Sequence, residues 1–116
     1  MTNRIFEELI GEKLSSVTFV VDYLQLSFDG PTISVYNPIT IKNGNIATRF
    51  RDDEFKNQIC LLIAKVVKQV TLSEKESLSV FFEDDSQIHI SLKESDYTGP
   101  EAISCSGFKN GAMLVA

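Results

Sequence analysis

Few residues in this chain have side chains suited to general acid–base or nucleophilic chemistry, and His89 is its single histidine. It stands in the alternating run Gln87–Ser91, whose two isoleucines predict a strand with His89 on the opposite, solvent-facing side. No neighbouring serine or cysteine pattern indicates a nucleophile that this imidazole could activate. We therefore predict no catalytic residue and expect that the protein is not an enzyme.

Three consecutive carboxylates, Glu83, Asp84 and Asp85, invite the interpretation of a metal or acid–base site. Their side chains would splay in a turn, and the spaced glycine and final glutamate of a calcium loop are absent. The glycines form no phosphate-binding loop, and no basic cluster is interleaved with aromatic residues. The sequence thus predicts no metal, no cofactor and no nucleic-acid partner.

The net charge of −5 is unevenly distributed along the chain. Residues 1–72 carry eight acidic and eight basic side chains, whereas residues 73–116 carry eight acidic side chains against three lysines. Such a field repels nucleic acid and attracts basic partners. A solvated acidic surface that keeps the protein soluble explains the same numbers.

Tyrosine stands beside a carboxylate at two expected strand junctions, Asp22-Tyr23 and Asp96-Tyr97. In protein interfaces, aromatic rings supply buried contact area while carboxylates pair with lysine and arginine. We therefore predict a partner-binding surface formed by Asp22, Tyr23, Asp84, Asp85, Asp96, Tyr97 and Glu101. Each of these residues also suits an ordinary core rim or solvated turn, so only their combination with the charge imbalance favours binding.

The element expected to organise the fold is an amphipathic helix over residues 51–67. Its apolar face is formed by Phe55, Ile59, Leu62, Ile63 and Val66, which recur at helical spacing. Nearly everything else resembles strand, apart from a short helix at residues 4–14. The predicted fold class is α+β, in which the main helix and the short N-terminal helix pack on a curved antiparallel sheet of six to eight strands.

Two stretches of the chain repeat the same order of apolar positions. Leu9-Ile10 and Val17-Thr18 match Leu62-Ile63 and Val70-Thr71, Leu24-x-Leu26-x-Phe28 matches Leu78-x-Val80-x-Phe82, and Ile33-x-Val35 matches Ile88-x-Ile90. The offset grows from 53 to 55 residues, so the insertions fall in turns. We interpret this as an internal duplication of a helix–strand–strand–strand unit, although chance similarity between amphipathic segments is the alternative.

The expected organisation is one domain, residues 1–116, with pseudo-repeats at about 4–48 and 52–95 and a C-terminal hairpin at 99–116. No apolar run approaches the roughly 20 residues that cross a bilayer, and the N-terminus lacks a signal-peptide hydrophobic region. We therefore expect a cytoplasmic protein without a membrane partner. Cys60 and Cys105 have no metal-ligand spacing and are expected to be small buried side chains in that reducing compartment.

Several of these features resemble small bacterial immunity proteins, including the cytosolic immunity proteins of contact-dependent growth inhibition and related polymorphic toxin systems. The likeness lies in Leu9-Ile10-Gly11 leading into Val17-Thr18, in Asp22-Tyr23-Leu24-Gln25-Leu26 and Asp29-Gly30, in the second copy, and in the segment Asp96-Tyr97-Thr98-Gly99-Pro100-Glu101-Ala102-Ile103. It implies a non-enzymatic inhibitor that binds one cognate toxin domain, which is expected to be a nuclease with a basic substrate groove.

Two other functions remain open from the sequence. One is a non-enzymatic binding module or adaptor with an unrelated partner. The other is a small-molecule-binding or enzymatic domain with a cavity inside the curved sheet, which a deep pocket with convergent polar groups would favour. The oligomeric state stays open as well, because an exposed strand edge can pair with a second copy.

Overall fold

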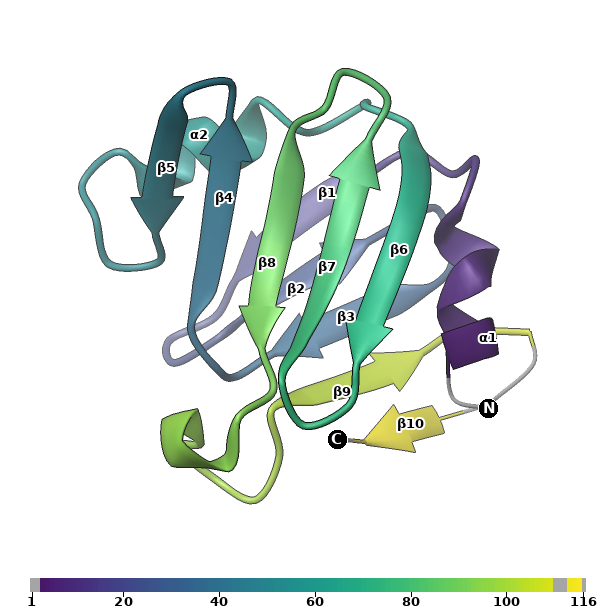
Figure 1. The fold of residues 1–116 in the computed structure, drawn as a ribbon, viewed down its shortest axis with the longest axis vertical. Helices are drawn as coiled ribbons and strands as arrows, with labels where there is room; N and C mark the ends of the chain where they lie inside the picture. Colours follow the sequence, from purple (N-terminus) through teal and green to yellow (C-terminus); the bar gives the residue numbers. More distant parts are fainter. Residues whose placement is uncertain (1–2, 110–112, 116) are drawn as a thin grey trace.

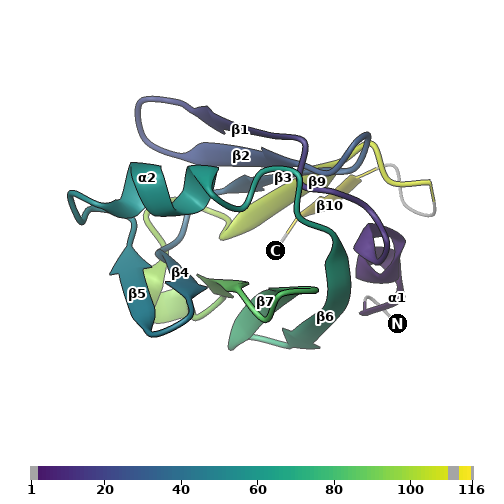
Figure 2. The ribbon, with the colours of Figure 1, turned by 90° about the horizontal axis from the view of Figure 1, so that it is seen from above.

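The computed structural model of the protein describes residues 3–109 and 113–115, and its strands form two antiparallel five-stranded sheets that lie face to face (Figures 1 and 2). The first sheet contains, in spatial order, β1 (Ser16–Phe19), β2 (Leu24–Ser27), β3 (Thr32–Val35), β9 (Ile103–Ser106) and β10 (Met113–Val115). The second contains β5 (Ile46–Arg49), β4 (Ile39–Asn43), β8 (Gln87–Ser91), β7 (Ser77–Phe82) and β6 (Val67–Ser73). The protein is therefore a two-layered β structure.

The predicted fold class is wrong. A single curved antiparallel sheet of six to eight strands packed on one main α-helix is replaced by two sheets packed on each other, with short helical turns at the open ends of the sandwich (Figure 2). The helical turns are α1 (Asn3–Phe6), η1 (Glu7–Leu9), α2 (Phe55–Cys60) and η2 (Glu94–Asp96). They close the layers rather than forming a layer of their own.

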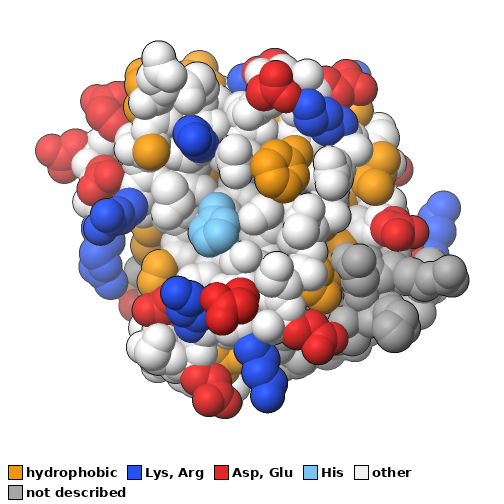
Figure 3. Space-filling model, in the orientation of Figure 1, with side chains coloured by type: hydrophobic (Ala, Val, Ile, Leu, Met, Phe, Trp, Pro, Cys, Tyr) orange, Lys and Arg blue, Asp and Glu red, His pale blue; other side chains and the backbone are white. Residues whose placement is uncertain are grey.

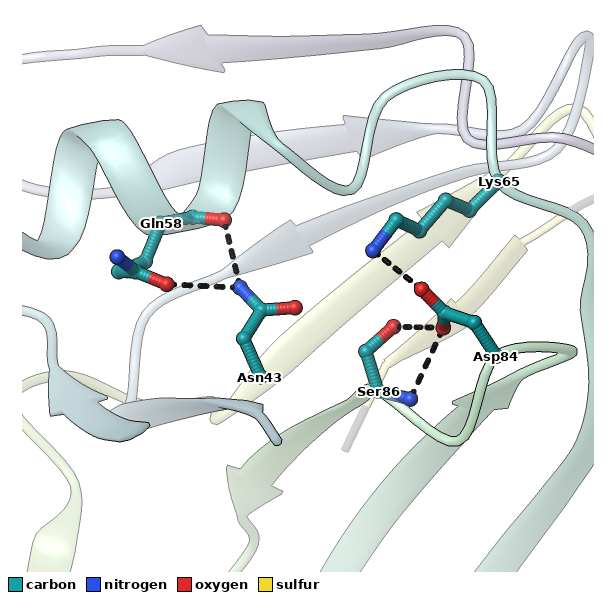
Figure 4. A network of polar contacts seen from close by, with 5 residues as sticks. All are labelled: Asn43, Gln58, Lys65, Asp84 and Ser86. Atoms are coloured by element: carbon teal, nitrogen blue, oxygen red, sulfur yellow. Dashed lines mark hydrogen bonds and ion pairs between the residues drawn. The ribbon is translucent and has the colours of Figure 1, made fainter. Parts of the chain in front are cut away.

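The expected main helix is only six residues long because the chain leaves it to make other backbone bonds. Phe55, Ile59 and Leu62 are buried as predicted, but Ile63 is 38% exposed. At Ala64 the backbone turns to a φ of 81°, which ends the helical path. Asn43 of β4 then fixes α2 in place, since its Nδ2 donates to the Oε1 and main-chain oxygen of Gln58 at 2.9 and 3.2 Å (Figure 4).

The space between the sheets is filled by apolar side chains. The positions predicted to face the core are 0 to 2% exposed in β2 and β3 and on the segment that follows β2, namely Leu24, Leu26, Phe28, Ile33 and Val35. Their counterparts in β7 and β8 are fully buried as well: Leu78, Val80, Phe82, Ile88 and Ile90. Strict alternation in these strands thus predicts the inner faces correctly.

The two halves of the chain meet at a short antiparallel bridge between Lys13 and Val66, which lie 53 residues apart. Four backbone hydrogen bonds flank it in two matched pairs. Gly11 N donates to Val67 O at 2.8 Å, and Ala64 N donates to Leu14 O at 2.7 Å; Leu14 N donates to Lys65 O at 3.1 Å, and Val67 N donates to Glu12 O at 2.9 Å. Adding 53 to the first-half residue number of one bond and subtracting 53 from its second-half number gives the matching bond, so this junction has local two-fold symmetry.

The strand registers of the two halves agree with the same symmetry. Leu24 pairs with Val35 in the first sheet, as Leu78 pairs with Ile90 in the second. Each three-stranded meander is then completed by a hairpin from the other half: β4 pairs with β8, and β9 pairs with β3. The exchange interlocks the two halves within one core. An origin by duplication, with the proposed boundaries, stays an interpretation.

No helix in the described part of the chain is long and apolar enough to span a membrane. The C-terminal hairpin predicted at 99–116 is described as β9 and β10, and its connection at residues 110–112 lies outside the described residues.

Candidate protein-interaction site

A groove opens where the β1–β2 turn, the β3–β4 connection and the segment between β5 and α2 approach one another. Its volume is about 1060 Å³, and we call it the Tyr36 groove. Its lining comprises Phe19, Val20, Val21, Asp22, Tyr36, Asn37, Pro38, Ile39, Thr40, Arg49, Phe50, Arg51, Asp52, Lys56 and Thr98. It is an open surface depression outside the apolar core.

Tyr36 contacts Tyr23 at the edge of this groove. The ring centroids are 4.9 Å apart and the planes are tilted by 41°. Burial, the nearby Glu101 carboxylate and Tyr23 raise the pKa of the Tyr36 phenol, against an opposing hydrogen bond with Ser34. The phenol therefore stays protonated at neutral pH and can donate a hydrogen bond.

The second half of the molecule has serines at the equivalent positions. The register that matches Leu24 with Leu78 and Val35 with Ile90 places Ser77 opposite Ser91, where the first half has Tyr23 and Tyr36. Strand pairing there is complete without an aromatic pair. The fold alone thus does not require these tyrosines, which makes them candidates for contact with another molecule.

Apolar side chains are exposed beside the tyrosines. Val21 is 95% exposed and Phe19 is 38% exposed. The Phe19 ring packs edge-on against Phe55 with 6.4 Å between centroids, and Lys56 Nζ lies 5.8 Å from the Phe19 ring centre. The groove therefore offers an anchored aromatic surface with a cation beside it.

Asn37 forms part of the groove lining and is 3% exposed. Its Nδ2 donates to the main-chain oxygens of Ser91 and Lys93 at 2.9 and 3.4 Å, which ties the β3–β4 connection to the end of β8. Its Oδ1 accepts no hydrogen bond from the described residues. Asn37 is thus a structural residue beneath the groove.

Asp84 and Asp85 lie in the β7–β8 turn and are engaged by lysines. Asp84 accepts from Lys65 Nζ at 2.5 Å and from Ser86 Oγ and N at 2.6 and 3.0 Å (Figure 4). The Lys65 hydrogen bond, followed by those from Ser86, lowers the pKa of the Asp84 carboxyl below its ordinary range. Asp85 accepts from Lys68 Nζ at 2.5 Å. These two carboxylates tie the turn to the segment after α2 and the start of β6.

Asp96 and Tyr97 stand at the end of η2. Asp96 accepts a hydrogen bond from Ser91 Oγ at 2.5 Å, and Tyr97 packs partly buried against the core. Thr98, directly after them, lines the Tyr36 groove. The segment therefore borders the groove while its acidic side chain is bound to β8.

The structure separates the predicted partner-binding residues into groups. Asp22, Tyr23 and Glu101 gather around Tyr36, and the chain segment that carries Asp96 and Tyr97 lies alongside. Asp84 and Asp85 belong to a different turn, where they pair with lysines. Sequence reasoning missed Arg49, Arg51 and Phe19, because only the tertiary fold brings them to the groove.

His89 lies on the outer face of the second sheet, as expected, but it is paired with Ser79 across the strands. Ser79 Oγ and His89 Nδ1 are 3.1 Å apart. Figure 3 shows the histidine on an open face among uncharged side chains, with acidic ones mainly toward the rim. Neither residue lines the Tyr36 groove, and no carboxylate hydrogen-bonds to the imidazole among the residues described, so the pair lacks an orienting acid. The hairpin register alone would have predicted the contact.

Only one of the two cysteines is buried as expected. Cys105 is buried, and burial raises the pKa of its thiol to about 12. Cys60 is exposed, so its prediction as a buried side chain is wrong: it falls on the solvent side of α2, between Ile59 and Leu61. Within the described residues, no group of three or more His, Cys, Asp or Glu could hold a metal ion.

Comparisons of the chain with family models, with curated proteins and with solved structures give no match.

Proposed function

We propose that this chain is a non-enzymatic immunity protein that binds and neutralises a cognate bacterial toxin domain in the cytoplasm. One observation carries the binding part of the proposal. The Tyr23–Tyr36 pair stands beside a groove at positions where the other half of the same fold has Ser77 and Ser91. Side chains that the scaffold does without are available for a partner.

The residue types at the groove are those that dominate the energetics of protein interfaces. Tyrosine and arginine are enriched among residues whose truncation weakens binding most. Tyr36 offers a ring and a phenolic donor, Phe19 and Val21 offer exposed apolar surface, and Arg49 and Arg51 supply planar cations. A toxin segment entering the groove would find apolar anchors with polar groups at the rim.

The excess of acidic residues supports a basic toxin domain, such as a nuclease with a positively charged substrate groove. Asp22 and Glu101 lie at the tyrosine pair, and Asp96 adds a negative charge from η2, whereas the charges of Asp84 and Asp85 are offset by Lys65 and Lys68. Charge complementarity accelerates association and excludes wrong partners, while the buried aromatic contacts hold the complex. Occlusion of the toxin's substrate groove would then neutralise it without catalysis.

The first experiment is co-purification with the protein encoded by the neighbouring gene, followed by affinity measurement. The double variant Tyr23→Ser, Tyr36→Ser installs the residues of the second half and should weaken toxin binding at least about thirtyfold, as expected for two anchors. Phe81→Ser is the matched control, because it removes an outward aromatic side chain from β7 and should leave affinity unchanged. Unchanged affinity in the double variant would contradict the groove as the binding site.

A second variant separates charge from aromatic anchoring. Reversal of Asp84, Asp85 and Asp96 to lysine should slow association and flatten its salt dependence, with little effect on dissociation. Unchanged affinity and salt dependence would remove the acidic-surface mechanism while leaving the groove intact. A partner that binds through the tyrosines but is not a toxin would assign the chain to adaptor proteins instead.

A further inference from the structure

The two sides of the Tyr36 groove carry charges of different sign. One side comes from the first sheet, where Asp22 lies in the β1–β2 turn and Glu101 lies beside the tyrosine pair. The other side comes from the end of β5 and the start of α2, which contribute Arg49, Arg51 and Lys56. In Figure 2, β1 and β2 lie on one side of α2 and β5 lies on the other. A segment that enters the groove therefore meets acids on one side and cations on the other.

Arg49 and Arg51 belong to a tight turn that other groups hold in place. Asp52 N donates to Arg49 O at 2.9 Å, and Arg49 N donates to Asp52 Oδ2 at 2.8 Å. Phe50, between the two arginines, packs edge-on against the buried Phe55 with 5.4 Å between the ring centroids. These contacts fix the turn and use neither guanidinium group.

The cations on this side form no ion pair with a carboxylate in the part of the chain that the structure describes. The ion pairs found there are those of Lys65 and Lys68, in the region of the β7–β8 turn. Asp52 shares the lining of the groove, but its Oδ2 accepts from a main-chain N–H. Asp53 and Glu54 follow it in the chain and do not line the groove. The two guanidinium groups are thus open to a ligand.

A carboxylate on a protein segment is the ligand that suits these groups best. A guanidinium group can donate two parallel hydrogen bonds to a carboxylate, and the Tyr36 phenol and the Lys56 ammonium group are further donors in the same lining. A phosphate chain suits the groove less well, because Asp22 and Asp52 also line it and the protein has a net charge of −5. The chemistry therefore favours an aspartate or glutamate side chain of a partner protein.

We propose that the Tyr36 groove takes a segment of the toxin domain that carries an aspartate or glutamate, and that Arg49 and Arg51 bind its carboxylate. This inference rests on the proposed function, since the toxin domain is the partner. Asp22 and Glu101 then face basic residues of the same domain, so the two sides of the groove fix the direction in which the segment lies. The toxin domain is basic overall and carries an acidic side chain where it enters the groove.

The affinity of charge variants for the co-purified toxin domain tests this assignment. Arg49→Gln and Arg51→Gln should each weaken binding about tenfold, and Arg51→Glu should weaken it at least about a hundredfold. Both side chains are exposed and main-chain groups close the turn, so the variants should fold as the parent does, which circular dichroism checks. Lys42→Glu is the matched control, because it changes the net charge as Arg51→Glu does at an exposed position of β4 outside the groove lining.

Charge exchange then identifies the carboxylate on the toxin domain. When each acidic residue of that domain is changed in turn to lysine, one variant should bind the parent chain at least about tenfold more weakly and regain affinity for Arg51→Glu. Arginine variants that bind as tightly as Lys42→Glu, or a loss that no toxin variant rescues, would overturn this inference while the proposed function stands. A parent chain that binds no toxin domain would overturn both.

Discussion

The two halves of the molecule use the same scaffold with different exteriors. Each begins with a short helical turn, continues into a three-stranded meander and sends a hairpin to the other half's sheet. Buried positions match in chemistry, as Phe28 and Phe82 do, whereas exposed ones differ, as the Tyr23–Tyr36 pair and the Ser77–Ser91 pair do. The difference separates the buried residues that the fold requires from the exposed tyrosines that only the first half carries.

The same comparison identifies a site of backbone strain. Gly11 and Ala64 occupy matching places at the junction and have φ values of 89° and 81°. Glycine adopts this conformation freely, whereas alanine is strained in it. The backbone of the second half is therefore strained at Ala64, whereas the backbone of the first half is unstrained at Gly11.

The largest expected effect tests whether the halves share the core equally. Phe28→Ala and Phe82→Ala should each destabilise the protein by about 3–5 kcal/mol, because both rings are fully buried. Urea unfolding followed by circular dichroism measures the loss, and Phe→Leu at the same positions serves if an alanine variant does not fold. If only one of the two alanine variants lost less than about 1 kcal/mol of unfolding free energy, the two halves would not contribute equally to the core.

Smaller effects on stability are expected at the junction between the halves, and the variants of the two halves should have opposite signs. Ala64→Gly should raise the free energy of unfolding by about 0.5–1 kcal/mol, and Gly11→Ala should lower it by about 1 kcal/mol. An added Cβ at Gly11 meets no heavy atom within 4 Å, so the cost there is backbone strain alone. Thermal unfolding of both variants checks the prediction, and a destabilised Ala64→Gly would contradict the strain.

The smallest effect concerns the β7–β8 turn, which has an ion pair. Asp84→Asn should cost about 1 kcal/mol or less at pH 7, because Asp84 and Lys65 are 49% and 30% exposed and solvent screens the pair. Since the folded-state pKa of Asp84 is lowered, its stabilisation is present above about pH 4 and is lost as the pH falls further. The free energies of unfolding of the parent and of Asp84→Asn should become equal at acidic pH. A difference that persists there would exclude the ion pair as its cause.

Strand positions and inner faces could be predicted from the sequence because alternation is a local signal. Leu24-x-Leu26 and Leu78-x-Val80 show it clearly, and both pairs are buried. Which sheet a hairpin joins is not local: Ile39 and Ile41 of β4 would face the core equally well beside β3 or β8. That ambiguity allowed a single curved sheet to be predicted in place of two.

The helix and the site show a second limit of local patterns. Helical spacing at residues 51–67 is real, yet backbone bonds to residues 11–14 end the helix at Ala64. The charge pattern likewise counts Asp84 and Asp85 as free acids, whereas lysines from the preceding segment bind both. Asp22, Tyr23 and Glu101 lie together because β9 pairs with β3 in the first sheet, which brings the residues before β9 to the end of β3.

Hydrogen exchange of the co-purified complex tests most directly whether the exterior of the first half does the binding. The account predicts slowed exchange on partner binding in residues 19–23, 36–40 and 98–101, with residues 73–77 and 91–93 of the second half unchanged. Protection confined to the second-half segments, or to the turn at residues 83–86, would contradict it.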